Sequence, residues 1–298
     1  MNKIAILSGG WSSEREVSIN SANNLKVVLS ELGFVVTVID VIRDLRKLVN
    51  DLYSAQPDYI WNSLHGTGGE DGTIQGILDI FGVPYSNSGV TGSAICFDKS
   101  VANSLVSNNG VRIVPNKCIK SSDISLISES YPFVVKPTNE GSSVGIYLIH
   151  NDKELQQFKA MPWQYGDRIL VEKFIPGREF TVLVVNGKVI GAVEITYDNE
   201  FYDYDAKYSE GGSRHNTNYD LDKKVELEMF DMAVNAYNAC LCRGIARIDF
   251  RYDGKDMYFL EINTQPGMTD KSLVPDILKA KNLSMLDLLK MTEPNIFA

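Results

Sequence analysis

Cysteine and histidine are scarce in this chain of 298 residues, and long apolar runs are missing. The four cysteines, Cys96, Cys118, Cys240 and Cys242, show no CxxC spacing, and the last two end an apolar helical pattern, which favours small core residues. The three histidines are too scattered to indicate a zinc site. No run approaches the ~20 apolar residues of a membrane span, and the N-terminal MNKIAILSGG is typical of a first strand rather than a signal peptide. The sequence therefore predicts a soluble, cytoplasmic protein with no membrane partner.

Basic tracts are missing as well, and the formal net charge is −9. This charge argues against nucleic acid or an anionic membrane as a partner, so an anionic ligand must be held by a few well-placed lysines and arginines. The hydrophobic content of 44% supports substantial cores. The length exceeds the roughly 100–200 residues of a typical domain, which predicts two or three domains.

The first 95 residues alternate strand and helix patterns. We expect strands over 4–7, 34–40 and 59–64, with helices over 14–32 and 45–55 between them. Such a βαβ order predicts a mainly parallel sheet, and ligands gather at the carboxyl ends of parallel strands. The loops GGWSSE and HGTGGEDG follow the first and third strands and lie at that edge.

Two further units follow, over about 96–175 and 176–298. The third opens with a hairpin, 178–185 and 188–195, that turns at Asn186-Gly187. A polar loop over 196–220 comes next and is too long for a simple connection, so it is a lid, a binding loop or a disordered segment. Its aromatic-rich stretch NEFYDYDAKYSEGG favours a lid.

A second hairpin is the most informative part of the chain. Residues 245–252 and 257–263 alternate apolar and polar side chains, and Asp253-Gly254 begins the turn between them. A loop over 254–256 pairs Asp253 with Met257, Asp249 with Glu261 and Arg247 with Asn263, and turns Ile248, Phe250, Leu260 and Ile262 toward the core.

This register sets the carboxylates of Asp249 and Glu261 against each other, which is destabilising unless a cation lies nearby. Oxygen-only ligands suit magnesium, which keeps waters and substrate phosphates in its shell. The hairpin alone leaves an alternative open, a solvated face on which arginines dilute the charge.

The segment VVKPTNEGSSVGIYLI could hold a polyphosphate, because Lys136 precedes a glycine-serine loop whose N–H groups can wrap phosphate oxygens. It lacks the Gly-Lys-Ser/Thr of a Walker A loop. By itself the loop is also compatible with a structural role. Other candidates have an equally ordinary alternative as surface charges or helix-start residues; they are Lys99, Glu172, Glu179, Glu14 and Ser18.

Taken in order, the segments GGWSSEREVS, LHGTGGEDGTIQG, FDKS, VVKPTNEGSSVG, VEKFIPGRE, FYDYDAKY, RIDF and LEINTQPGMTDKSLVP resemble the ATP-grasp superfamily and, within it, the D-alanine–D-alanine ligases. The resemblance covers nearly the whole chain. It implies an α/β ATP-grasp fold of three domains. These are an N-terminal parallel-sheet, substrate-binding domain (1–95), a central subdomain (96–175) and a C-terminal catalytic domain (176–298) with its lid at about 196–220.

The activity that the resemblance implies is the ATP-dependent joining of two D-alanines for peptidoglycan. One D-alanine carboxylate attacks the γ-phosphate of ATP to give an acyl phosphate, and the amine of the second D-alanine then displaces phosphate. The resemblance also implies two Mg²⁺ ions, with Mn²⁺ as a substitute, ATP as co-substrate and a homodimer. A ligase with another amino acid or a hydroxy acid as acceptor, and a nucleotide-binding module without catalysis, remain alternatives.

Residue roles carry over motif by motif. The metal ions would be held by Asp249, Glu261 and Asn263. ATP would be bound by Lys99, Lys136, Ser143, Glu172, Glu179 and Lys207. The lid would be locked by hydrogen bonds among Glu14, Ser142 and Tyr208. The oxyanion would be stabilised by Arg247 and the N–H of Gly267. The two D-alanines would be contacted by Glu14, Ser18, His65, Arg247, Gly267, Ser272 and Leu273. One departure concerns the lid, because the family usually continues to Pro-Ala after the positions of Lys207-Tyr208, whereas this chain reads SEGGSRHNTNYDLD.

Overall fold

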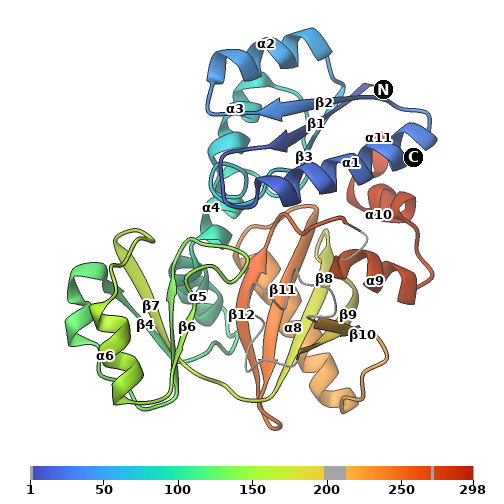
Figure 1. Ribbon diagram of the computed structural model, residues 1–298. Helices are drawn as coiled ribbons and strands as arrows, with labels where there is room; N and C mark the ends of the chain where they lie inside the picture. Colours follow the sequence, from blue (N-terminus) through green and yellow to red (C-terminus); the bar gives the residue numbers. More distant parts are fainter. Residues whose placement is uncertain (1–2, 198–212, 270–271, 298) are drawn as a thin grey trace.

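A computed structural model describes residues 3–197, 213–269 and 272–297, which form three β-sheets surrounded by helices (Figure 1). Lys207 and Tyr208, which the sequence analysis predicted as lid residues, lie outside the described residues. In the part of the chain that is described, no helix is both long and apolar enough to cross a membrane.

The N-terminal sheet is parallel, in the order β2-β1-β3, as the βαβ pattern predicted. Alternate residues of β1 pack on opposite faces: Ile4 and Ile6 lie in one core with α1, whereas Ala5 and Leu7 lie in another with α2 and α3. The strands are β1 (Lys3–Gly9), β2 (Val35–Val41) and β3 (Tyr59–Asn62). The helices are α1 (Arg15–Glu31), α2 (Leu45–Ala55), α3 (Thr73–Phe81) and α4 (Val90–Phe97).

The central sheet is antiparallel, in the order β4-β7-β5-β6. Its core contains Phe133, Val135, Ile169 and Val171 and is covered by α6, whose Leu155 and Phe158 are buried. The strands are β4 (Asn116–Lys120), β5 (Phe133–Pro137), β6 (Tyr147–Ile149) and β7 (Arg168–Lys173). The helical segments here are α5 (Lys99–Asn108), the 3₁₀ helix η1 (Ser121–Leu126) and α6 (Asp152–Ala160).

The C-terminal sheet has the order β10-β9-β8-β11-β12, with α8 on one face and α9 on the other (Figure 1). Asn186 and Gly187 both have positive φ, +46° and +76°, which confirms the predicted hairpin turn. The strands are β8 (Arg178–Val185), β9 (Lys188–Tyr197), β10 (Ser213–Asn216), β11 (Ile245–Tyr252) and β12 (Met257–Asn263). The helices are α8 (Lys223–Ala239), α9 (Leu273–Ala280), α10 (Met285–Thr292) and α11 (Pro294–Phe297).

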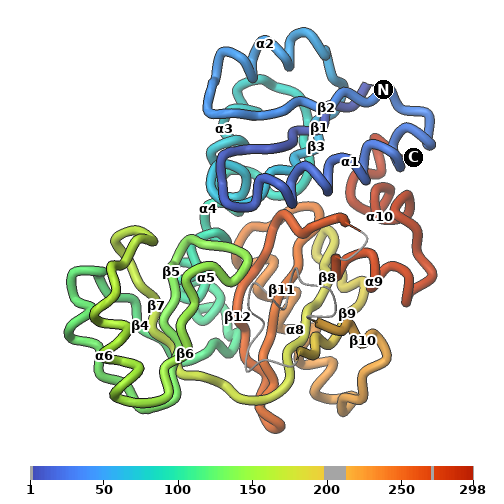
Figure 2. Tube along the Cα trace, in the orientation of Figure 1, coloured from blue at the N-terminus to red at the C-terminus, as the bar shows by residue number. Residues whose placement is uncertain are grey.

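The two ends of the chain pack together. The ring of Phe297 in α11 contacts Phe34 and Tyr59 at centroid distances of 5.5 and 5.7 Å, so the last helices complete the core beneath the N-terminal sheet (Figure 2). Helix α5 packs with α8 on the C-terminal sheet, where Ala102 and Val106 are buried. The predicted division at residues 95 and 175 stays a proposal, because these cores are shared between segments far apart in the chain.

The predicted register of the β11–β12 hairpin is confirmed far from the turn and wrong near it. Asp249 pairs with Glu261 and Arg247 with Asn263, but Met257 pairs with Tyr252 rather than with Asp253. The register shifts by one residue beyond Asp249, since Phe250 pairs with Phe259 and leaves Leu260 without a partner. This bulge turns Phe259 into the core and Leu260 out of it, which corrects the predicted core position of Leu260.

The predicted polar loop over 196–220 is also shorter than expected. Strand β9 extends to Tyr197, and Ser213–Asn216 pairs with it as β10. Among the cysteines, Cys240 is fully buried, as predicted, and Cys242 is half-buried against the same core. The Sγ atoms of Cys96 and Cys242 lie 3.6 Å apart, a proximity that the sequence spacing did not indicate.

Candidate active site

Two adjoining cavities lie where the three sheets meet. The larger, of about 560 Å³, runs from α1 to the start of α9, and the smaller, of about 120 Å³, lies between the central and C-terminal sheets. Lys99 and Glu261 line both cavities. The larger is also lined by the predicted residues Glu14, His65, Ser142, Arg247, Asn263, Gly267, Ser272 and Leu273. The smaller is also lined by Lys136, Ser143, Glu172, Glu179 and Asp249.

Among the predicted site residues that the structure describes, Ser18 is the one that lines neither cavity. Its side chain is fully buried, and its hydroxyl oxygen accepts a hydrogen bond from the N–H of Gly9 at 2.9 Å. Ser18 therefore ties α1 to the end of β1, and its predicted contact with D-alanine stays a prediction.

The acidic pair on the hairpin is already accompanied by protein cations. Arg247 donates to both oxygens of Asp249, with Nε–Oδ1 at 3.0 Å and Nη2–Oδ2 at 2.8 Å, and the Thr181 hydroxyl also donates to Oδ1. Lys99 Nζ lies 3.1 Å from Glu261 Oε2. The repulsion that the sequence suggested is thus relieved by the Arg247 guanidinium and the Lys99 ammonium.

Lys99 remains a cation in this setting. Burial alone would lower the pKa of its ammonium, but the charge of Glu261 and the hydrogen bond to it raise that pKa above its ordinary value. The same ammonium donates to the Glu140 carbonyl oxygen at 2.6 Å. Lys99 therefore links the loop before β6 to the end of β12.

The chemistry of the donor set fits a magnesium ion. Asp249 lies opposite Glu261, and Asn263 is two residues further along the same face, so three oxygen donors share one side of the hairpin. Within residues 3–197, 213–269 and 272–297, no group of three or more His, Cys, Asp and Glu side chains could hold a metal ion. The Asn263 amide oxygen and substrate phosphate oxygens are therefore needed to complete a shell, as magnesium sites commonly use.

The smaller cavity pairs buried charges with an apolar wall. Lys136 Nζ lies 2.7 Å from Glu172 Oε2, and both side chains are less than 10% exposed. Glu179 Oε2 accepts from Arg251 Nη1 at 2.7 Å and from the Tyr197 hydroxyl at 2.8 Å. The bulged Leu260 lines this cavity with Ile146 and Val134. An apolar cavity edged by fixed carboxylates suits an adenine and its ribose.

The glycine-serine loop reaches across to α1. The Ser142 hydroxyl donates a short hydrogen bond to Glu14 Oε1, and a side chain at Gly141 would come within 2.8 Å of Glu14 Oε2. Ser142 and Ser143 both have positive φ, +48° and +60°. Successive residues of this kind turn their N–H groups toward one point, a geometry that binds anions, and strained backbone of this kind clusters at functional sites.

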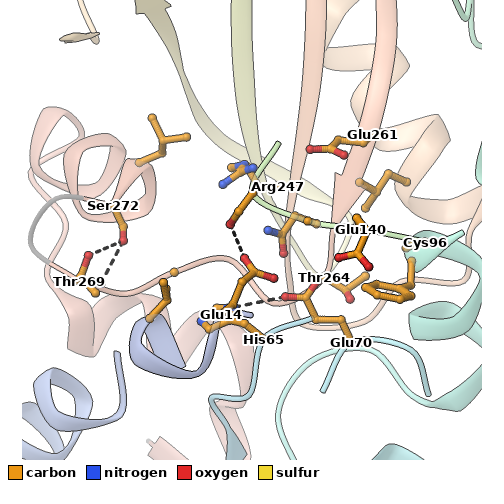
Figure 3. A pocket seen from close by; sticks show the side chains of 18 of the residues that line it. Glu14, His65, Glu70, Cys96, Glu140, Arg247, Glu261, Thr264, Thr269 and Ser272 are labelled. Atoms are coloured by element: carbon orange, nitrogen blue, oxygen red, sulfur yellow. Dashed lines mark hydrogen bonds and ion pairs between the residues drawn. The ribbon is translucent and has the colours of Figure 1, made fainter. Parts of the chain in front are cut away.

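Around the larger cavity, Glu14, Arg247, Glu261 and Ser272 surround one space (Figure 3). At its far end the Ser272 hydroxyl is 2.8 Å from the Thr269 hydroxyl and accepts from the Thr269 N–H at 3.1 Å. A methyl group at Gly267 would come within 2.9 Å of Ser272 Oγ, so these two residues lie side by side. This end offers hydroxyl and backbone N–H donors, which suit a carboxylate.

Comparisons with known proteins place the chain in one family. The family model described as D-ala D-ala ligase C-terminus matches residues 105–292. A D-alanine–D-alanine ligase from Rhodospirillum rubrum is 42% identical over 288 residues, covering 96% of this chain and 95% of the relative. The chain belongs to the D-alanine–D-alanine ligase family.

Solved structures place the family fold on the whole chain. The D-alanine–D-alanine ligase from Bacillus anthracis superposes with a TM-score of 0.85 at 28% identity, covering 100% of this chain and 99% of that one. The same ligase complexed with ATP gives 0.83 at 25%, with the same coverage. The VanG D-Ala:D-Ser ligase from Enterococcus faecalis gives 0.83 at 27%, covering 100% of both chains. The predicted ATP-grasp architecture is confirmed.

Several site residues of this family member were not predicted from its sequence. Glu70 pairs with His65, Arg251 and Tyr197 hold Glu179, and Thr269 holds Ser272. Arg251 had a usable signal, because it follows Arg247 and Asp249 at period two and so shares their face. For Glu70 and Thr269 the sequence held no signal beyond their places in the quoted motifs, because loop conformation determines which residues they contact.

His65 provides a pH-dependent prediction. Burial alone would lower the pKa of its imidazole, but the hydrogen bond to Glu70 and the charges of Glu70 and Glu14 raise the pKa above 6.5. The Glu70→Gln substitution is therefore expected to lower the pKa of His65, measured by NMR titration of the ring protons.

The same shift fixes the sign of a stability change. Because the folded-state pKa is raised, the stabilisation from protonated His65 is complete below about pH 6.5 and is lost as the pH rises through the folded-state value. The stability advantage of the wild type over Glu70→Gln should thus shrink from pH 6 toward alkaline pH. An advantage that grows with pH would contradict the assigned ion pair.

Proposed function

We propose that this protein joins two D-alanine molecules with consumption of ATP, for the synthesis of a peptidoglycan precursor in the cytoplasm. Membership of the D-alanine–D-alanine ligase family supports the activity. The observation that carries the proposal is the meeting of the two cavities at Lys99 and Glu261. A nucleotide in the smaller cavity would place its terminal phosphate beside an amino acid in the larger one.

The donor amino acid is proposed to lie between α1 and the hairpin. Glu14, oriented by Ser142, would hold its ammonium, and His65 would lie beside it. Lys99 and Lys136 would bind the phosphates, and Glu172 and Glu179 would bind the adenine and the ribose. The donor carboxylate would then attack the γ-phosphate, and the fixed cations would supply much of the required charge neutralisation.

The acceptor is proposed to lie toward α9. Ser272 and the backbone of Leu273 would receive its carboxylate, which leaves its amine directed at the acyl phosphate. Arg247 and the Gly267 N–H would stabilise the oxyanion that develops as phosphate leaves. Asp249, Glu261 and Asn263 would hold two Mg²⁺ ions, or Mn²⁺ in their place, and the bound ions would neutralise charge on the phosphates. Lys207 and Tyr208 remain predicted lid contacts.

The decisive experiment measures phosphate release from ATP with D-alanine, D-serine, D-lactate or no acceptor, and detects the product by mass. D-alanyl-D-alanine as the main product is expected. If the enzyme used D-alanine as donor but turned over only when another acceptor was present, the assignment of D-alanine as acceptor would be wrong. ATP binding without phosphate release under any of these conditions would favour a nucleotide-binding module and sink the proposed activity.

A homodimer is proposed as well. The N-terminal sheet region exposes large apolar side chains, with Val35, Leu45, Tyr53 and Ile80 between 59% and 90% exposed, more than isolated surface residues require. Sedimentation velocity should give twice the mass of the chain. A single species at the monomer mass across micromolar concentrations would contradict the dimer.

A further inference from the structure

Gln265 lies behind the acceptor end of the site, outside both cavities, and it is 4% exposed. It follows β12 at the start of the turn that leads through Pro266 to Gly267. Its own N–H donates to the Asn263 amide oxygen at 2.8 Å. The side chain therefore projects from the segment that joins the proposed metal-binding face to the proposed oxyanion donor.

Both polar atoms of the Gln265 side chain bind the N-terminal region. Its Nε2 donates a short hydrogen bond to the carbonyl oxygen of Asn62, the last residue of β3, and its Oε1 accepts from Asn87 Nδ2 at 2.5 Å. Asn62 and Asn87 are 1% and 3% exposed. One amide thus bridges residues 203 and 178 positions away in the chain.

Each partner holds a segment that carries proposed chemistry. The Asn62 side chain accepts from the Leu64 N–H at 3.1 Å and donates to the Gly69 carbonyl at 3.0 Å, which shapes the loop containing His65. Asn87 Oδ1 accepts from the N–H of Ile245 at 3.2 Å, at the start of the strand that carries Arg247. The bridge therefore joins three segments: the loop that carries His65 (the donor loop), strand β11 with Arg247, and the turn over 265–267 (the acceptor turn).

We infer that Gln265 is a positioning residue that fixes the acceptor turn at Gly267 relative to the donor loop at His65, and so sets the distance over which the second amino acid attacks. Pro266 restricts the backbone between Gln265 and Gly267, so a displaced glutamine would carry the Gly267 N–H with it. Displacements of about 1 Å can cost roughly 10²-fold in rate when reacting groups must meet at fixed separation. The nucleotide cavity is not lined by any member of the bridge.

This inference rests on the proposed function, and the test keeps the two apart because wild-type ligation is measured first. Gln265→Met keeps the length of the side chain and removes both hydrogen bonds. We expect kcat/KM for the acceptor D-alanine to fall roughly 10- to 100-fold, while the affinity for a non-hydrolysable ATP analogue changes less than about twofold. The matched control is Thr292→Val, which removes a buried hydroxyl bond of 2.7 Å to Leu288 in α10 and should leave these kinetics unchanged.

Gln265→Glu supplies a second readout. A carboxylate can accept from Asn87 but cannot donate to the Asn62 carbonyl, whereas a protonated carboxyl group can do both. Activity of this variant relative to wild type should therefore rise as the pH falls. The comparison uses equal concentrations of folded protein, so a role in folding alone would not produce this pH dependence. Wild-type kinetics in Gln265→Met, an equal loss of ATP affinity, or a pH-independent defect in Gln265→Glu would each overturn the positioning role.

Discussion

Replacing Glu261 by glutamine is expected to lower kcat by roughly 10²- to 10³-fold, the size of effect seen when one group that stabilises transition-state charge is removed. Glu261 is the carboxylate shared by both cavities, it lies opposite Asp249, and it pairs with Lys99 at 3.1 Å. The amide keeps the shape but loses the charge that would attract a divalent ion and orient Lys99. Phosphate release at saturating ATP and D-alanine measures the effect.

The matched control for this change is Asp256→Asn on the same hairpin. Asp256 is paired with Arg112 at 3.4 Å with both side chains over 30% exposed, and exposed pairs of this kind contribute little. Its substitution should leave kcat within about twofold, on that argument. If excess Mg²⁺ gave Glu261→Gln full wild-type turnover, the proposed role of Glu261 in holding the metal ion would be wrong.

Replacing Arg247 by methionine is expected to abolish ligation and to destabilise the fold by about 3–5 kcal/mol, the usual cost of removing one partner from a buried ion pair. The Arg247 and Asp249 side chains are 15% and 8% exposed and meet in a two-bond fork. Arg247→Lys should retain more stability but little activity, because an ammonium cannot reproduce the planar fork or its direction.

A double variant separates the two effects. Arg247→Met combined with Asp249→Asn leaves no uncompensated charge, so denaturant unfolding should recover most of the lost stability while ligation stays absent. Recovery of activity along with stability would show that Arg247 acts only by neutralising Asp249, and it would also contradict the proposed metal-binding role of Asp249. In that case the proposed oxyanion role would fall to the Gly267 N–H alone.

The alternation of apolar and polar residues in the two hairpin strands correctly predicted that Asp249 lies opposite Glu261, because a period of two fixes which side chains share a face. The prediction failed at Leu260 for a related reason. A bulge inserts one residue without changing the composition of the strand, so the alternation beyond it reverses face. Leu260 thereby lines the smaller cavity and Phe259 takes its place in the core.

Ser18 shows a different limit. The motif places it one turn after Glu14, the residue that caps α1, and both belong to a segment that resembles a substrate-binding one. Only the packing of α1 on β1 shows that Glu14 faces the cavity while the Ser18 hydroxyl is used by the Gly9 N–H. Helical spacing gives relative directions of side chains, but the neighbouring strand decides which direction is solvent, cavity or core.

The sequence by itself determined the family, most strands and most helices, and nearly all of the site residues that it predicted within the described part of the chain line the two cavities. Those features depend on local periodicity, turn residues and ordered motifs, which are written along the chain. The tertiary structure decided that Arg247 and Lys99 neutralise the acidic pair, that Glu70 raises the pKa of His65, and that Gln265 bridges Asn62 and Asn87. Lys99 and Glu261 are 162 residues apart, and Gln265 lies 203 and 178 residues from Asn62 and Asn87, so only packing brings these side chains within a few ångströms. The His65–Glu70 contact spans five residues and is set by the shape of their loop.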